Sequence, residues 1–121
     1  MKSNGVHDIS LVERNIYMLD YMRISEEYRY KTELHAHTKP VSLCSEITPE
    51  EIVRAYYEYG CDTLTVTNHL NPDWTPSRTD EYLSGYYDTK KAAEGTGMNV
   101  VLGVEIRFTE NANDYLVYGV S

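Results

Sequence analysis

The chain has 121 residues, 41% of them hydrophobic, and it has no long apolar run, so we expect one soluble domain at most and no membrane partner. Its formal net charge of −8 argues against a nucleic-acid partner, because such a surface needs a basic stripe to neutralise phosphates. Two cysteines are too few for a disulfide framework, and the N-terminus lacks the apolar core of a signal peptide. These features predict a cytoplasmic protein.

The first thirty residues have the pattern of an amphipathic helix. Ser10 and Glu13 have the spacing of a capping box, which marks a helix start. One helical face then carries apolar residues at Val12, Ile16, Leu19 and Met22. We expect residues 1–30 to form an N-terminal helical extension and residues 31–121 to form the main domain.

Strand and helix patterns alternate after residue 30. The predicted strands are residues 31–38, 63–67, 100–105 and 115–120. A capping box at Thr48 and Glu51 opens a helix that ends at Gly60, and Ser77 with Asp80 opens another from about Thr79 to Glu94. Alternation of this kind implies parallel strands, so we expect an α/β fold with about four mostly parallel strands.

Four residues at the ends of three predicted strands carry the candidate chemistry. His35 and His37 are two residues apart on one strand, so their side chains share a face and can converge on one metal ion. His69 and Glu105 occupy matching places after two later strands. Parallel strands bring such ends together, so all four are candidate metal ligands, and His69 and Glu105 are candidate catalytic residues as well.

Imidazole and carboxylate ligands favour Zn, Mn or Fe as the divalent metal. Such a metal lowers the pKa of its bound water and supplies hydroxide as a nucleophile, so no serine or cysteine nucleophile is needed. Arg78, in a rim loop, is a candidate for substrate phosphate binding. Cys44 can act as a soft ligand, but the absence of a partner cysteine at ligand spacing favours a small buried residue.

Three motifs resemble those of the polymerase and histidinol phosphatase (PHP) family. They are Glu33-Leu34-His35-Ala36-His37-Thr38, Thr67-Asn68-His69 and Gly103-Val104-Glu105, in the family's order. The stretches 48–53, 60–64 and 114–119 also resemble the family's first helix, second strand and the strand after its bridging glutamate. The resemblance runs from about Glu33 to Gly119.

This resemblance implies the N-terminal part of a distorted (β/α) barrel that holds several divalent metals. It implies a histidinol-phosphatase-like hydrolase that cleaves a phosphate ester on a small phosphorylated molecule. By position, His35 and His37 would bind one metal, Glu105 would bridge it to a second, and His69 would bind a further ion.

The chain departs from the family pattern in three ways. The usual Thr-Asp-His motif has Asn68 in its middle, and Asp114 stands where many members carry histidine. The family's remaining ligands come from later strands, beyond Ser121. We therefore expect half of a longer protein, a truncated product, or a homo-oligomer that supplies the missing half.

Two alternatives remain open from the sequence. One is a catalytically incomplete module that binds metal or oligomerises without turnover, which the missing ligands and Asn68 favour. The other is a polymerase-associated accessory domain, which the acidic charge disfavours.

Overall fold

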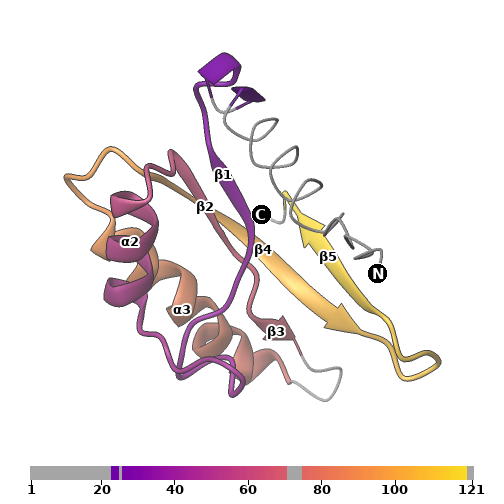
Figure 1. Cartoon of the computed structure of the whole chain (residues 1–121). Helices are drawn as coiled ribbons and strands as arrows, with labels where there is room; N and C mark the ends of the chain where they lie inside the picture. The colour runs from indigo at the N-terminus through magenta and orange to yellow at the C-terminus, as the bar shows by residue number, and fades with distance from the viewer. Residues whose placement is uncertain (1–22, 25, 71–74, 120–121) are drawn as a thin grey trace, which may run out of the picture.

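The computed structural model describes residues 23–24, 26–70 and 75–119, and the predicted first helix with its Ser10–Glu13 capping pair lies outside them. The elements in chain order are β1 (Thr32–Ala36), α2 (Pro49–Glu58), β2 (Thr63–Val66), β3 (His69–Leu70), the 3₁₀ turn η1 (Pro76–Arg78), α3 (Thr79–Ala92), β4 (Asn99–Arg107) and β5 (Asp114–Tyr118). Figure 1 shows α2 and α3 on one side of a twisted sheet. The predicted α/β class is confirmed.

Most of the sheet is parallel, as predicted. β1 pairs with β2, and β2 pairs with the first half of β4. β3 pairs with β4 further along, and the partners differ by 36 residues in both ladders: Thr63 lies opposite Asn99, and His69 opposite Glu105. β3 therefore continues the line of β2 along β4. A two-residue strand is too short to leave a pattern in the sequence, so it was not predicted.

β5 is the antiparallel strand of the sheet, and it pairs with the second half of β4. Gly103 of β4 has little room for a side chain, because a Cβ there would stand 3.1 Å from Thr65 Cγ2 of β2 and 3.2 Å from the Val117 carbonyl of β5. The Tyr118 hydroxyl donates a 2.8 Å hydrogen bond to the Leu34 carbonyl of β1. The sheet therefore curls from β5 toward β1 without closing, which is compatible with part of a (β/α) barrel.

The start of α2 is confirmed in detail. The Thr48 side chain accepts a hydrogen bond from the Glu51 amide, and the Glu51 carboxylate accepts one from the Thr48 amide. Pro49 takes the first helical position, where its missing N–H costs nothing. Gly60 follows the helix with φ +84°, a conformation that favours glycine.

The predicted cap of α3 is wrong. Arg78 occupies the N-cap position without a side-chain cap bond, because η1 runs directly into the helix and Arg78 is already in a helical conformation. The helix ends at Ala92, and Gly95 and Gly97 after it both have positive φ.

Two apolar clusters join the helices to the sheet. The larger one includes Leu64 and Val66 of β2 and Ile52 and Val53 of α2, all buried. The smaller one contains Val41, Tyr82 and Val104. Among the described residues, no helix has the length and apolar character needed to cross a membrane.

Candidate metal centre

A β-bulge in β1 sets the direction of the first histidine. Glu33 lies opposite Leu64 and Ala36 opposite Val66, so three steps on β1 match two on β2. The His35 amide donates instead to the Glu33 carboxylate, at 2.8 Å. Bulges commonly redirect a side chain beside a functional site. The strand was predicted to run to Thr38 but ends at Ala36, so His37 and Thr38 lie beyond it and begin the loop.

Three ligand atoms converge at the ends of β1 and β4. The Nε2 atoms of His35 and His37 are 3.0 Å apart, and they lie 3.1 and 2.7 Å from Glu105 Oε2. Ligand atoms bonded at about 2.0–2.1 Å to one ion lie roughly 2.9–3.4 Å from each other. The chemistry and spacing of these groups therefore fit a divalent metal.

His69 joins this group from β3. Its Nδ1 lies 3.4 Å from the same Glu105 oxygen, and its ring centroid lies 4.5 Å from that of His37. Its backbone amide donates to the Ser42 hydroxyl at 3.1 Å, which holds the start of β3 against the loop. The structure thus brings together all four of the predicted ligands.

Burial acts on one imidazole of the cluster, that of His37. The Glu105 side chain is only 7% exposed, whereas that of His35 is 46% exposed. Burial, followed by the neighbouring His69, lowers the pKa of His37, against the opposing effect of Glu105. Neutral imidazole is the form that binds a metal.

Cys44 lies beside the histidines, and the sequence-based expectation of its burial is wrong. It was expected to be buried, yet it is exposed, and its sulfur lies 3.2 Å from His37 Nδ1. Ligand atoms of His37, Cys44 and His69 all lie within 4.8 Å of one another. The signal in the sequence was its position in the loop directly after the two histidines.

Asn68, where the family usually has aspartate, lies beneath the cluster and is 1% exposed. Its side-chain oxygen accepts hydrogen bonds from the Thr38 amide and the Ser42 hydroxyl, each at 2.8 Å, and its amide donates to Thr38 Oγ1. Its backbone carbonyl accepts from the Glu105 amide at 3.1 Å. Asn68 therefore connects the loop after β1 to the strand that carries Glu105.

Asp114 forms an ion pair with Arg107. Its two carboxylate oxygens accept hydrogen bonds from Arg107, at 2.6 and 2.7 Å, across the β4–β5 ladder. This pairing lowers the pKa of the Asp114 carboxyl. The position where many family members have a histidine is thus occupied by one half of an exposed salt bridge.

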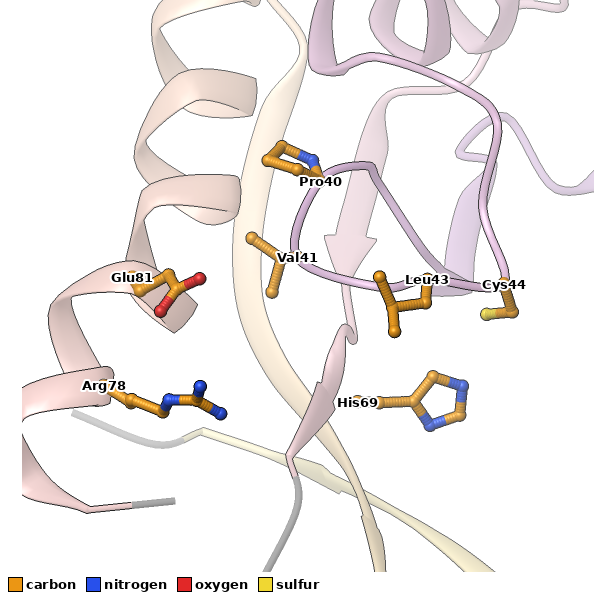
Figure 2. Close-up of a pocket in the computed structure, with 7 residues that line it drawn as sticks. All are labelled: Pro40, Val41, Leu43, Cys44, His69, Arg78 and Glu81. Atoms are coloured by element: carbon orange, nitrogen blue, oxygen red, sulfur yellow. The ribbon is translucent and has the colours of Figure 1, made fainter. Parts of the chain in front are cut away.

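A pocket of about 470 Å³ adjoins the cluster. Figure 2 shows His69, Cys44 and Leu43 on one side and Arg78 and Glu81 on the other. Arg78 supplies the positive charge among the described lining residues, at the position where the sequence predicted a phosphate contact.

The comparison with protein families decides the assignment. The family model described as the PHP domain matches residues 33–118, which include every motif of the site. The chain belongs to the PHP domain family. PHP domains form a superfamily of metal-dependent phosphoesterases.

A curated relative of this PHP domain corrects the predicted partners. It is a DNA polymerase III PolC-type from Oceanobacillus iheyensis, 22% identical over 111 residues, which cover 92% of this chain and 6% of that relative. The expectation of a small-molecule partner alone, with no nucleic acid, is contradicted by this match. The net charge misled the prediction because the match covers only 6% of that relative. The charge of this chain therefore says nothing of the surface charge on the remainder of the relative.

Proposed function

We propose that the chain hydrolyses a phosphate ester with divalent metal ions held by His35, His37, His69 and Glu105. The observation that carries the proposal is the approach of three imidazoles to one buried carboxylate oxygen, at 3.1, 2.7 and 3.4 Å. Bound divalent ions there would polarise a phosphoryl oxygen and lower the pKa of a water molecule. Zn, Mn and Fe suit this set of donors.

The chain's own residues have distinct roles in this proposal. Glu105 holds negative charge at the centre of the imidazoles, so it offsets the charge of the cations. Arg78 faces His69 across the pocket, and its guanidinium is suited to binding a phosphate. The buried Asn68 keeps the loop and β4 at a fixed separation.

The test is hydrolysis of para-nitrophenyl phosphate and bis(para-nitrophenyl) phosphate by the purified chain loaded with Zn, Mn or Fe. We expect Glu105→Gln to lower turnover by more than about 100-fold, because it removes a metal-binding charge with little change in shape. Glu110→Gln, at an exposed position on the β4–β5 turn, is the matched control and should retain full activity. Stoichiometric metal without turnover would instead support a catalytically incomplete metal-binding module.

The match to a PolC-type DNA polymerase supports a second candidate, in which the ester is a phosphodiester of nucleic acid. End-labelled single-stranded DNA tests this candidate in the same metal-loaded assays. Shortened products that disappear in Glu105→Gln would favour it. Intact DNA alongside cleavage of para-nitrophenyl phosphate would exclude it.

A further inference from the structure

Arg107 carries a positive charge at the border of the candidate metal centre. It follows Glu105 by two residues on β4, so the two side chains lie on the same face of the strand. The two backbone positions are roughly 6–7 Å apart along the strand. The Glu105 side chain meets the three histidines on this face. Arg107 is therefore the next residue beyond the cluster on the face that carries it.

Asp114 holds the Arg107 guanidinium in one orientation. It lies opposite Arg107 on β5, which runs beside β4 (Figure 1). Its carboxylate oxygens accept hydrogen bonds from Arg107 Nε at 2.7 Å and from Nη2 at 2.6 Å. These bonds occupy one edge of the planar group and two of its five N–H donors. The guanidinium plane is thus fixed before any ligand arrives.

The rest of the guanidinium is free to bind an anion. Within the described part of the chain, its other N–H groups have no hydrogen-bond partner, and the side chain is 61% exposed. Arginine binds phosphate through parallel N–H···O bonds from one edge of the guanidinium. The edge that Asp114 leaves open has the donors for such a contact.

Electrostatic effects place this ion pair beside the cluster. The hydrogen bond from Arg107 lowers the pKa of Asp114, and the nearby His69 and His35 lower it further. The hydrogen bond to Asp114 raises the pKa of Arg107, and the charge of Glu105 raises it further. The ion pair and the candidate ligands therefore lie close enough to act on one another. An anion bound at the cluster would also meet the guanidinium.

We propose that Arg107 is a further phosphate-binding residue, which binds the substrate's phosphoryl oxygens beside the cluster, and that Asp114 is the positioning residue that orients it. The inference rests on the proposed function. It adds a contact from β4 to the one that Arg78 supplies from the end of η1. An ion pair that served only the β4–β5 hairpin would have no effect on phosphate, which gives the test its contrast.

The test is calorimetric titration of inorganic phosphate into the chain loaded with Zn²⁺ and freed of unbound ion. We expect Arg107→Gln to weaken phosphate binding by about 10-fold or more, because charge-assisted hydrogen bonds are lost, with the zinc content unchanged. Arg107→Lys keeps the charge without the planar fork, so it should recover only part of the affinity. Arg54→Gln, at an exposed position of α2, is the matched control and should bind phosphate like the unmodified chain.

Asp114→Asn separates phosphate binding from a role in the hairpin alone. Both Asp114→Asn and Arg107→Gln remove the ion pair, so an effect transmitted only through the hairpin should be equally large in the two variants. We expect Asp114→Asn to weaken phosphate binding less, because the guanidinium remains and only its orientation is lost.

Three results would overturn the inference. The first is unchanged phosphate affinity in Arg107→Gln, and the second is an equal loss in Arg107→Gln and Asp114→Asn. The third is failure of the zinc-loaded, unmodified chain to bind phosphate. A chain that binds phosphate through Arg107 but cleaves no phosphate ester would refute the proposed function and leave this inference standing.

Discussion

Asn68 and His69 are neighbours in sequence but belong to two contrasting layers. Asn68, Thr38 and Ser42 form a buried layer, at most 1% exposed, in which neutral groups satisfy one another. His69 belongs to an exposed layer with His35, His37, Cys44 and the buried Glu105, where lone pairs and charge converge.

The two layers have different roles: the buried layer stabilises the fold, and the exposed layer is suited to binding a metal. No buried side-chain nitrogen or oxygen in the described residues lacks a hydrogen-bond partner, so the buried layer is complete as it stands. The exposed layer gathers imidazole nitrogens around one carboxylate, an arrangement that a cation would stabilise. Substitutions in the buried layer should therefore change stability, whereas those in the exposed layer should change metal binding.

The largest effect is expected at Asn68. Asn68→Leu leaves the buried Thr38 amide and Ser42 hydroxyl without their acceptor, so we expect the free energy of unfolding to fall by about 3–5 kcal/mol. Urea denaturation of the metal-free chain measures it. Asn68→Asp keeps the shape and the acceptors and should cost much less. An equal loss in both variants would contradict the role given to the hydrogen bonds.

The exposed layer should respond in the opposite way. The double variant His35→Ala with His37→Ala should unfold at nearly the same urea concentration as the unmodified chain when both are metal-free. Metal at about 100 times its Kd should stabilise the unmodified chain by about 2.7 kcal/mol and the variant hardly at all. Elemental analysis should find the ion missing from the variant. Equal stabilisation of both would place the metal elsewhere.

Gly85 of α3 tests how tightly the buried layer is packed. An added Cβ would lie 2.5 Å from Asn68 Nδ2 and 3.1 Å from Thr38 Oγ1. We expect Gly85→Ala to lower the free energy of unfolding by about 1–3 kcal/mol, despite the better helix propensity of alanine. Thermal or urea unfolding measures the change. Asp88→Ala, at an exposed position of the same helix, should change stability by less than about 0.5 kcal/mol. An unchanged free energy of unfolding in Gly85→Ala would show that the buried layer adjusts easily to an added methyl group.

The smallest effect is expected at the β-bulge of β1, where Glu33 holds the backbone of His35. Glu33→Ala removes the acceptor of the His35 amide, so His35 should lose its fixed direction and metal affinity should fall by about 10-fold. Glu46→Ala, at an exposed loop position, is the control for the lost charge. Calorimetric titration with Zn²⁺ compares them. Unchanged affinity in Glu33→Ala would mean that the bulge holds its shape without this bond.

The gathering of the four candidate ligands was predictable because its cause is topological. Parallel strands end at the same edge of a sheet, so His35, His37, His69 and Glu105 come together there, although the strand spacing predicted for His35 and His37 does not hold. The cap of α2 was predictable for a local reason, since Thr48 and Glu51 are only three residues apart.

The misplaced residues depend on contacts that sequence spacing does not express. Cys44 reaches His37 through a loop whose turns are set by Ser42 and Ser45. The bulge at Glu33 arises from register between strands, and the strand pattern contains no sign of it. Asp114 differs from these two cases, because the opposite charges of Arg107 and Asp114 flank the β4–β5 turn and indicate their pairing from the sequence.

The change of partners along β4 predicts an order of amide hydrogen exchange. Its first half pairs with β2 and its second half with β3 and β5, so freeing β4 requires opening all three ladders. All five residues of β5, in contrast, are exposed. The amides of β4 should therefore exchange only on global unfolding, and those of β5 through cheaper local opening. The backbone beneath Glu105 should be the last part of the molecule to acquire deuterium.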